Sequence, residues 1–227
     1  MKALQCTSIV KSFGEPPIEV LRSISFAVER GEFIAITGRS GSGKSTLLYV
    51  ASGLDNPTSG KVLFNEKNVH TLDSKELHEF RNEKMGFVFQ FHYLLPELTA
   101  LENILMPARK SGKEKLMRDR ALDYIERFEL RHCTNKYPSQ MSGGEQQRVA
   151  VARALIMNPE MLFADEPTGN LDSVNGKRVL AILEDINRRH GMTILLVTHE
   201  ADFAARAERQ IHLADGRIVR DAATVKP

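Results

Sequence analysis

Residues 38–46 carry the pattern that defines the chemistry of this chain most narrowly. They read GRSGSGKST, between a strand-like and a helix-like run, and satisfy G-x-x-x-x-G-K-[ST] through Gly38, Gly43, Lys44 and Ser45. Glycine-rich backbone allows N–H groups to converge on phosphate oxygens, and the helix adds the positive end of its dipole. The motif therefore predicts a nucleotide-phosphate site, with Lys44 near the β- and γ-phosphates. Three further loop residues belong to the same predicted nucleotide-phosphate site: Ser40, Gly41 and Thr46.

Two adjacent carboxylates, Asp165 and Glu166, follow a second apolar run at residues 161–164. Ligands of open α/β sheets bind beyond the carboxyl ends of the strands. We therefore expect Asp165 to hold Mg²⁺, directly or through water, together with the Ser45 hydroxyl. Glu166 is then placed to polarise water for attack on the γ-phosphate, as a general base. Acidic pairs at strand ends are common, and the phosphate loop in the same chain favours the catalytic interpretation.

A second glycine-rich helix start occurs at residues 141–148, MSGGEQQR. Ser142 is expected to cap the helix, and Gly143 and Gly144 allow an anion to approach the backbone closely. An ordinary serine-capped helix is the simpler interpretation of this segment on its own. Because the chain has only one set of metal and base carboxylates, either it binds two separate anions or the second site completes that of another copy. The second alternative predicts a dimer with nucleotide at its interface.

The apolar periodicity predicts an α/β core that is interrupted by a helical segment. Strands are expected at residues 4–10, 24–28, 33–37, 61–64, 85–90, 161–164 and 193–197, with a closing hairpin of 210–213 and 217–220 around Asp215-Gly216. Helices are expected from the phosphate loop to about residue 53, and at about 98–106, 114–128, 144–157, 174–189 and 200–207. Strands that alternate with helices indicate a mostly parallel sheet covered on both faces. We interpret residues 91–158 as a helical subdomain inserted into a core of residues 1–90 and 159–227, within one domain spanning 1–227.

The charge of the chain is nearly balanced. The 31 Lys and Arg against 29 Asp and Glu leave a net charge of +2, which provides no electrostatic footprint for nucleic acid or direct membrane adhesion. Cys6 and Cys133 are too few and too isolated for a disulfide framework or a zinc cluster, and they fit a reducing cytosol. The first residues lack the apolar segment of a signal peptide, and no apolar run approaches the ~20 residues that cross a bilayer. We therefore expect any membrane role to come through a partner.

The order of these motifs resembles that of the ATPase subunits of ATP-binding cassette (ABC) transporters. The resemblance covers essentially the whole chain and rests on residues 38–46, Gln90, residues 142–146, Asp165-Glu166, Asp172 and His199. It implies an enzyme that hydrolyses ATP with the help of Mg²⁺. It also implies a P-loop NTPase core with a mostly parallel sheet, an N-terminal antiparallel β subdomain and an inserted helical subdomain.

The resemblance also implies roles for four residues that spacing alone leaves undefined. Phe13 resembles the aromatic residue that stacks on adenine, and Gln90 resembles the glutamine that touches Mg²⁺ or the attacking water and senses the membrane partner. Asp172 is similar to an aspartate that contacts the opposite subunit, although a helix N-cap is a simpler interpretation. His199 resembles the switch histidine that hydrogen-bonds the γ-phosphate. Without the other motifs, each of the four would be interpreted as a structural or surface residue.

In such a family two copies of the subunit join head to tail around two ATP molecules. Ser142 and Gly144 of one copy then face the γ-phosphate held by Lys44 of the other. Met141 and Glu145 replace the commoner Leu and Gln of this signature motif, and both changes are mild.

The resemblance extends to a subfamily that works on periplasmic partners. Residues 52–60, 89–103 and 164–172 resemble those of lipoprotein-releasing ATPases, whose relatives include MacB-type efflux and FtsE-type division ATPases. Residues 89–103 are expected to line a groove for integral membrane permease subunits. We expect the chain to drive lipoprotein release from the cytoplasmic face of the bacterial inner membrane, as a peripheral subunit without direct membrane insertion.

Other kinds of ABC protein fit less well. A DNA-repair ATPase needs a long coiled coil between the phosphate loop and the signature motif, and the segment here is too short. A translation factor usually carries two cassettes per chain, whereas this chain has one copy of each motif. A nucleotide-gated scaffold with negligible turnover would not need Glu166 and His199.

Overall fold

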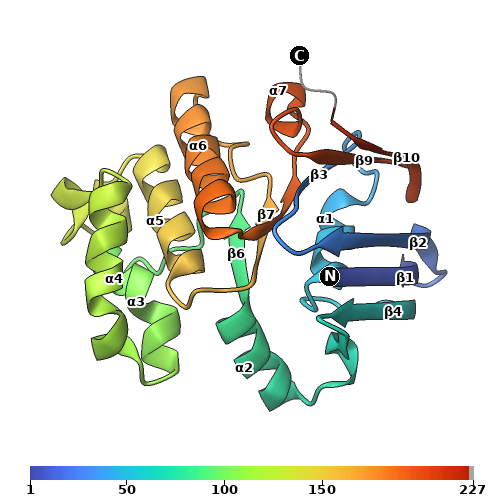
Figure 1. The fold of residues 1–227 in the computed structure, drawn as a ribbon, viewed down its shortest axis with the longest axis horizontal. Helices are drawn as coiled ribbons and strands as arrows, with labels where there is room; N and C mark the ends of the chain where they lie inside the picture. The colour runs from blue at the N-terminus through green and yellow to red at the C-terminus, as the bar shows by residue number, and fades with distance from the viewer. Residues whose placement is uncertain (225–227) are drawn as a thin grey trace.

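Two β-sheets of different type form the framework of the molecule (Figure 1), which the computed structural model describes for residues 1–224. Neighbouring strands of the first sheet are antiparallel, whereas in the second sheet all neighbours are parallel except β10 and β9. In spatial order the first sheet consists of β2 (Ile18–Glu29), β1 (Lys2–Phe13), β4 (Ser59–Phe64) and β5 (Lys67–Asn68). The second consists of β10 (Arg217–Ala223), β9 (Arg209–Ala214), β3 (Phe33–Thr37), β8 (Thr193–Val197), β7 (Met161–Asp165) and β6 (Met85–Phe89). The predicted mostly parallel sheet and antiparallel β subdomain are confirmed.

The central strands are apolar on both faces because both faces are covered. Ile34 and Ile36 of β3 pack in a core with α1 (Lys44–Ala51) and the first sheet. Phe33 and Ala35 pack in a second core, with the helices of the opposite side. All four side chains are at most 2 % exposed. This double burial explains why β3, β7 and β8 appear in the sequence as continuous apolar runs.

Among the described residues, five helices lie on the face of the second sheet that is opposite α1. Three of them form a layer at one end of the molecule, and the other two pack over the central strands. Figure 1 shows α3, α4 and α5 together on the left, with α6 and α7 between them and the edge strands β9 and β10. These helices are α3 (Ala100–Lys110), α4 (Glu114–Arg127), α5 (Gly143–Leu155), α6 (Ser173–His190) and α7 (Ala201–Ala204). The first three lie within the range interpreted above as a helical subdomain.

One buried amide holds the non-helical segment that leads into α3. Asn103 is fully buried, and its Oδ1 accepts a hydrogen bond from the Leu95 N–H at 2.8 Å. Its Nδ2 donates to three carbonyl oxygens at 2.9–3.1 Å, those of Leu95, Leu98 and Thr99. Because buried backbone groups need partners, this side chain fixes the course of residues 95–99.

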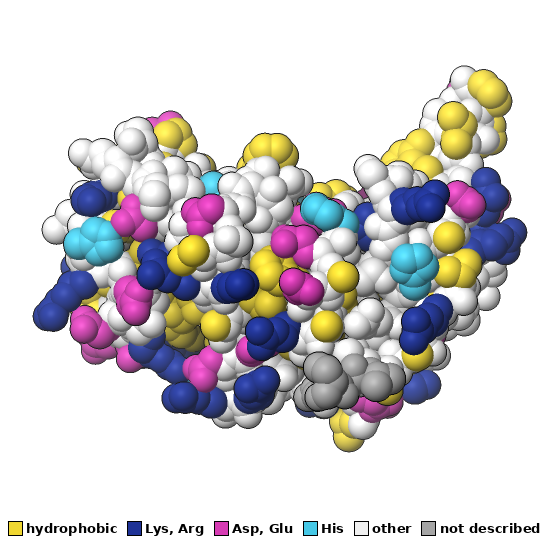
Figure 2. All heavy atoms as spheres, turned by 90° about the horizontal axis from the view of Figure 1, so that it is seen from above, with side chains coloured by type: hydrophobic (Ala, Val, Ile, Leu, Met, Phe, Trp, Pro, Cys, Tyr) yellow, Lys and Arg dark blue, Asp and Glu magenta, His cyan; other side chains and the backbone are white. Residues whose placement is uncertain are grey.

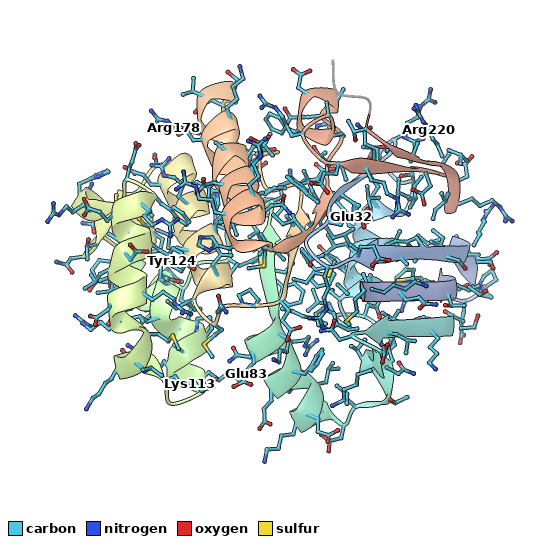
Figure 3. The ribbon with its side chains drawn as sticks, in the orientation of Figure 1. Glu32, Glu83, Lys113, Tyr124, Arg178 and Arg220 are labelled. Carbon is cyan, nitrogen blue, oxygen red and sulfur yellow. The ribbon has the colours of Figure 1, made fainter. Side chains whose placement is uncertain are left out.

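The structure contains one helix that the sequence analysis did not predict, α2 (Ser74–Lys84). None of its residues is fully buried, and only Leu77 and Phe80 pack against the core, which is too short an apolar pattern to mark a helix. A capping box starts it, in which Asp73 accepts from the Glu76 N–H at 2.8 Å and Glu76 accepts from the Asp73 N–H at 3.3 Å. This Asp-x-x-Glu spacing is the signal that could have revealed the helix. Figure 3 shows Glu83 of α2 beside Lys113, whose Nζ lies 2.6 Å from Glu83 Oε1 and ties α2 to the start of α4.

Apart from the two-residue strand β5 and the 3₁₀ turns, the other differences concern the lengths of elements. β2 extends beyond the predicted 24–28 because it continues past a left-handed residue, Ser23, where the pairing register shifts. β1, predicted at 4–10, extends at both ends as the partner of β2. The helix predicted at 200–207 is a single turn, α7. The closing hairpin forms as predicted, since Asp215 and Gly216 have the two positive φ values, 47° and 73°, that a type I′ turn requires.

Within residues 1–224, none of the helices combines the length and the apolar character needed to cross a lipid bilayer. Figure 2 shows acidic and basic side chains interspersed over the face seen from above, in keeping with the small net charge.

Asn103→Ala is expected to lower the free energy of unfolding by about 2–4 kcal/mol, because the backbone of residues 95–99 loses partners where water cannot replace them. Urea denaturation at neutral pH measures the effect. Asn135→Ala, at an exposed asparagine of the same layer, is the control and should change the free energy by less than about 0.5 kcal/mol. Equal stability of the two variants would contradict the role assigned to Asn103.

Candidate nucleotide site

The carboxyl ends of three parallel strands meet at one level of the second sheet. Ile36 of β3 is paired with Val197 of β8, which is paired in turn with Asp165 of β7. The phosphate loop, the acidic pair and His199 therefore leave the sheet side by side, although they are far apart in the sequence.

The phosphate loop runs from β3 to α1 through left-handed glycines. Gly38, Gly41 and Gly43 have φ values of 146°, 78° and 99°. A Cβ atom on Gly38 would lie 2.3 Å from the carbonyl oxygen of Leu213, and one on Gly43 would lie 2.9 Å from Leu21 Cδ2. Both positions require glycine for conformation and for space. The shape of the loop is therefore set by the surrounding fold.

Lys44 lies inside the loop. The residue is 6 % exposed, and its Nζ donates to the carbonyl oxygens of Gly38 and Arg39, both at 3.1 Å. These bonds hold the ammonium group at the loop, where a bound phosphate needs a counter-charge.

Ser45 and Asp165 form a pair of oxygen ligands. Ser45 Oγ donates to Asp165 Oδ1 at 2.9 Å, and the Tyr49 hydroxyl lies near the same carboxylate. Burial raises the pKa of Asp165 above its ordinary value, while the hydrogen bonds from Tyr49 and Ser45 act in the opposite direction. A buried carboxylate with a hydroxyl beside it fits a hard divalent cation such as Mg²⁺, which prefers oxygen ligands.

Glu166 and His199 form a hydrogen-bonded pair beyond the sheet edge. His199 Nδ1 lies 2.9 Å from Glu166 Oε2. The backbone of Glu166 is left-handed, with φ 44°, which for a residue other than glycine stores strain of a kind that recurs at functional sites. Both side chains line a cavity of about 790 Å³ whose walls also include Gly38, Ser40 and Lys44. The structure thus brings the residues predicted as base, switch and phosphate ligands to one cavity.

Three further residues near this site were not predicted from the sequence. Local sequence patterns could have indicated only one of them, Tyr49. Thr37 and His212 line the same cavity, and Thr37 Oγ1 lies 2.9 Å from His212 Nδ1. They meet because β9 pairs with β3 in parallel, and no local sequence pattern predicts this long-range contact. Tyr49, in contrast, follows Ser45 by four residues on α1, and this spacing places both side chains on one helix face.

Gln90 is tied to a residue outside the predicted set, Asn170. Gln90 Nε2 donates to Asn170 Oδ1 at 3.2 Å, and Asn170 Nδ2 donates to the Gln90 carbonyl oxygen at 3.1 Å. A Cβ atom on Gly169 would lie 3.0 Å from Gln90 Nε2 and 3.4 Å from Glu166 Oε2. Gln90 and Glu166 therefore converge on the same short segment after β7.

The signature motif lies apart from this cavity. Ser142 and Glu145 form a capping box at the start of α5, in which the Ser142 N–H donates to Glu145 Oε2 at 2.6 Å. A Cβ atom on Gly144 would lie 2.5 Å from Asn175 Cγ, so this glycine allows α5 to pack closely against α6. Gly143 is exposed. As far as the described residues go, none of the three predicted ATP contacts of this motif lines the cavity beside Lys44.

Asp172 and Phe13 also lie outside the lining of that cavity, which was traced over residues 1–224. Asp172 is the N-cap of α6 and accepts from the N–H groups of Val174 and Asn175 at 3.0 and 2.9 Å. Phe13 ends β1, is 46 % exposed, and has Lys11 Nζ 4.7 Å from its ring centroid.

The sequence model of the ABC transporter family matches residues 21–169. The chain belongs to the ABC transporter ATPase family. It is 51 % identical to the lipoprotein-releasing system ATP-binding protein LolD of Leptospira interrogans, over 95 % of this chain and 90 % of that protein. LolD 1 of Chlorobium chlorochromatii is 49 % identical, over 89 % of this chain and 83 % of that protein.

A solved structure agrees with this family assignment. The dimeric ATP-binding cassette MJ0796 in a post-hydrolysis state, bound to ADP and Pi, superposes with a TM-score of 0.89 at 40 % identity. The match covers 98 % of this chain and 99 % of that one. The predictions of an ABC ATPase fold and of an ATP-hydrolysing enzyme are confirmed.

In this ABC ATPase, the helix that begins with the signature motif also holds the segment after β6. Gln147 Nε2 donates to the carbonyl oxygen of Phe89 at 3.2 Å. Arg153 donates to the carbonyl oxygens of Tyr93 and His92 at 2.6 and 2.7 Å. Burial lowers the pKa of Arg153 to about 10. α5 therefore connects the signature motif to the segment expected to face the membrane partner.

A row of aromatic side chains crosses the ABC ATPase from its sheet to its surface. Ring centroids are 5.6 Å apart for Phe163 and Phe87, 6.1 Å for Phe87 and Phe89, and 5.3 Å for Phe89 and Tyr93. Phe91 lies 6.4 Å beyond Tyr93. Phe163 is fully buried in β7, whereas Phe91 and Tyr93 are 61 % and 64 % exposed. Beside the row is a groove of about 390 Å³ between α2, β6, α3 and α5.

Glu145→Gln is expected to reveal a pH-dependent contribution to stability. Burial opposes the charged form, but hydrogen bonds from His132 and Ser142 outweigh it and lower the pKa of Glu145 from 4.5 to about 2. Because the pKa is lowered on folding, the carboxylate stabilises the fold above pH 4.5 and loses that contribution as the pH falls toward 2. The variant should lose about 1–3 kcal/mol of unfolding free energy at neutral pH and less than about half of that at about pH 3.

Urea denaturation of both chains at the two pH values, in the presence of EDTA, measures this difference. Glu97→Gln, at an exposed glutamate, is the control. A loss of the same size at both pH values would show that the charge of Glu145 is not the cause.

Proposed function

We propose that this chain is the ATP-hydrolysing subunit of a transporter that releases lipoproteins from the bacterial inner membrane. The observation that carries the proposal is the 51 % identity to LolD of Leptospira interrogans over 95 % of the chain. That relative is named for a lipoprotein-releasing system, and so is the relative from Chlorobium chlorochromatii.

In the proposed reaction, the phosphate loop binds ATP and the acidic pair acts on it. Lys44 neutralises phosphate charge, supported by the loop residues Gly38, Ser40, Gly41, Gly43 and Thr46. Ser45, Asp165 and Gln90 would hold Mg²⁺, which when bound neutralises charge on the β- and γ-phosphate oxygens. Glu166 orients water and takes its proton, and His199, 2.9 Å away, contacts the γ-phosphate.

We further propose that Ser142, Gly143 and Gly144 complete the nucleotide site of a second copy of the chain. A glycine-rich helix start is suited to bind an anion, but these residues do not line the cavity beside Lys44 of their own copy. Their separation from that cavity therefore supports binding to the phosphates of a second copy. The similar cassette MJ0796 is described as a dimer. The exposed positions of Asp172 and Phe13 fit contacts with the other copy and with adenine.

The proposed membrane partner is a permease that binds at the groove beside Phe89 and Tyr93. The exposed rings of Phe91 and Tyr93 provide an apolar contact surface of the kind found in interfaces. The aromatic row leads from this surface to Phe163, two residues before Asp165 in β7. A partner at this groove would hold the chain at the cytoplasmic face of the inner membrane.

Glu166→Gln is expected to bind ATP but to hydrolyse it at least about 100-fold more slowly, because the general base is lost. The variant should then accumulate as an ATP-bound dimer. Phosphate release and size-exclusion chromatography with ATP measure the two effects. Asp202→Asn, at an exposed carboxylate of α7, is the control and should hydrolyse ATP normally. Normal turnover by Glu166→Gln would remove this residue as the base.

The lipoprotein assignment is tested by capturing the Glu166→Gln chain with ATP from solubilised membranes of its host bacterium. We expect integral proteins with large periplasmic domains that retain acylated lipoproteins. A further variant with Phe91→Ala and Tyr93→Ala should still dimerise with ATP but lose these proteins, because the contact surface is reduced. Capture of efflux or cell-division proteins instead would overturn the lipoprotein assignment while leaving the ATPase activity in place.

A further inference from the structure

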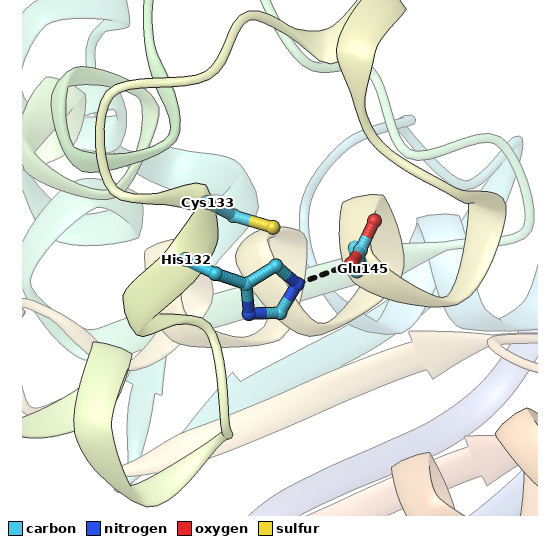
Figure 4. A group of neighbouring side chains, drawn as sticks. All are labelled: His132, Cys133 and Glu145. Carbon is cyan, nitrogen blue, oxygen red and sulfur yellow. Dashed lines mark hydrogen bonds and ion pairs between the residues drawn. The ribbon is translucent and has the colours of Figure 1, made fainter.

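A second group of metal-ligating side chains lies outside the nucleotide site, beside the start of α5. His132 and Cys133 belong to the 3₁₀ turn η2 (Arg131–Cys133), and Glu145 belongs to the first turn of α5. One ligand atom of each residue lies within 4.8 Å of the other two. Figure 4 shows the three side chains pointing toward one another from these two elements.

We propose that His132, Cys133 and Glu145 form a binding site for Zn²⁺. An imidazole nitrogen, a sulfur and a carboxylate oxygen are the three kinds of ligand that Zn²⁺ takes in proteins, and water can supply the fourth position. Mg²⁺ prefers oxygen ligands, so this donor set selects a different ion from that of the nucleotide site. The proposed site contains only one cysteine, so no pattern of paired cysteines marks it in the sequence.

The present contacts already hold the ligand atoms close together. His132 Nε2 donates to Glu145 Oε1 at 2.6 Å, and Cys133 Sγ lies within 4.8 Å of the ligand atoms of both residues. Zn²⁺ bound at about 2.0–2.3 Å from each ligand keeps neighbouring ligand atoms about 3–4 Å apart. Binding therefore requires small side-chain shifts and the loss of protons from the ligand atoms. The ion replaces the hydrogen bond between His132 and Glu145, the imidazole proton moves from Nε2 to Nδ1, and the thiol proton passes to solvent.

The surroundings of the cluster suit an ion site. The other oxygen of Glu145, Oε2, accepts from the Ser142 N–H at 2.6 Å, which orients the carboxylate and leaves Oε1 for the ion. Cys133 is fully buried, so its sulfur is fixed, whereas the His132 side chain is 57 % exposed and provides a path of entry. An ion here would tie η2 to the first turn of the signature helix.

The test measures ion binding alone and does not depend on the proposed function. The untagged full chain is titrated with Co²⁺, a spectroscopic substitute for Zn²⁺, in a large excess of Mg²⁺. We expect one Co²⁺ per chain, with the near-ultraviolet charge-transfer absorption of a thiolate ligand that disappears when Zn²⁺ displaces it. Cys133→Ser should abolish that absorption, and Cys6→Ser, at the other buried cysteine, should retain it. Binding to the unmodified chain without thiolate absorption, or no binding, would overturn the proposal.

Because Cys133 is buried, its substitution could unfold the chain, and a variant at the exposed His132 tests the site independently. His132→Ala should weaken Zn²⁺ binding at least about 10-fold in a competition assay with a chromophoric chelator. His190→Ala, at an exposed histidine at the end of α6, should bind Zn²⁺ as the unmodified chain does. Equal affinity of the two histidine variants would also overturn the proposal.

Discussion

The nucleotide site depends on the parallel pairing of β3, β8 and β7. Ile36, Val197 and Asp165 lie in one row across these strands, and the phosphate loop, His199 and Glu166 follow directly beyond that row. Because both faces of the strands are buried, a shift of register by one residue would exchange the side chains of the two cores. The same shift would separate Asp165 from Ser45, which now lie within one hydrogen bond. The packing of the sheet therefore fixes the geometry of the site.

Helix α5 connects two parts of the molecule, the signature motif and the segment that follows β6. Its first turn contains the signature motif, and Gly144 brings that turn against Asn175 of α6. Further along the helix, Gln147 and Arg153 hold the backbone of residues 89–93, which leads to the exposed aromatic surface. If the proposed membrane partner binds at this surface, its movement would act through these hydrogen bonds on the helix that also presents the signature motif. The reciprocal bonds of Gln90 and Asn170 connect the same segment to the residues after Glu166.

Much of the core and the phosphate loop could be predicted from the sequence because local patterns determine them. β3, β7 and β8 are buried on both faces and therefore appear as apolar runs, and the glycines of residues 38–43 serve backbone conformations that few other residues adopt. Local patterns failed where the stabilising contact is polar or distant. α2 contributes only two partly buried side chains to a core and is also held by a cap and by the ion pair of Glu83 with Lys113. Thr37 meets His212 only through the pairing of β3 with β9.

The internal bonds of Lys44 have a consequence for selectivity against small anions. Its ammonium group is already shared by the carbonyl oxygens of Gly38 and Arg39, at 3.1 Å each. Hydrogen bonds from a charged donor contribute about 1.5–3 kcal/mol each, so an incoming anion must compete with them. A single phosphate ion offers few contacts in exchange for these two bonds. A triphosphate can engage the loop N–H groups and the lysine together, so the exchange favours the longer phosphate chain.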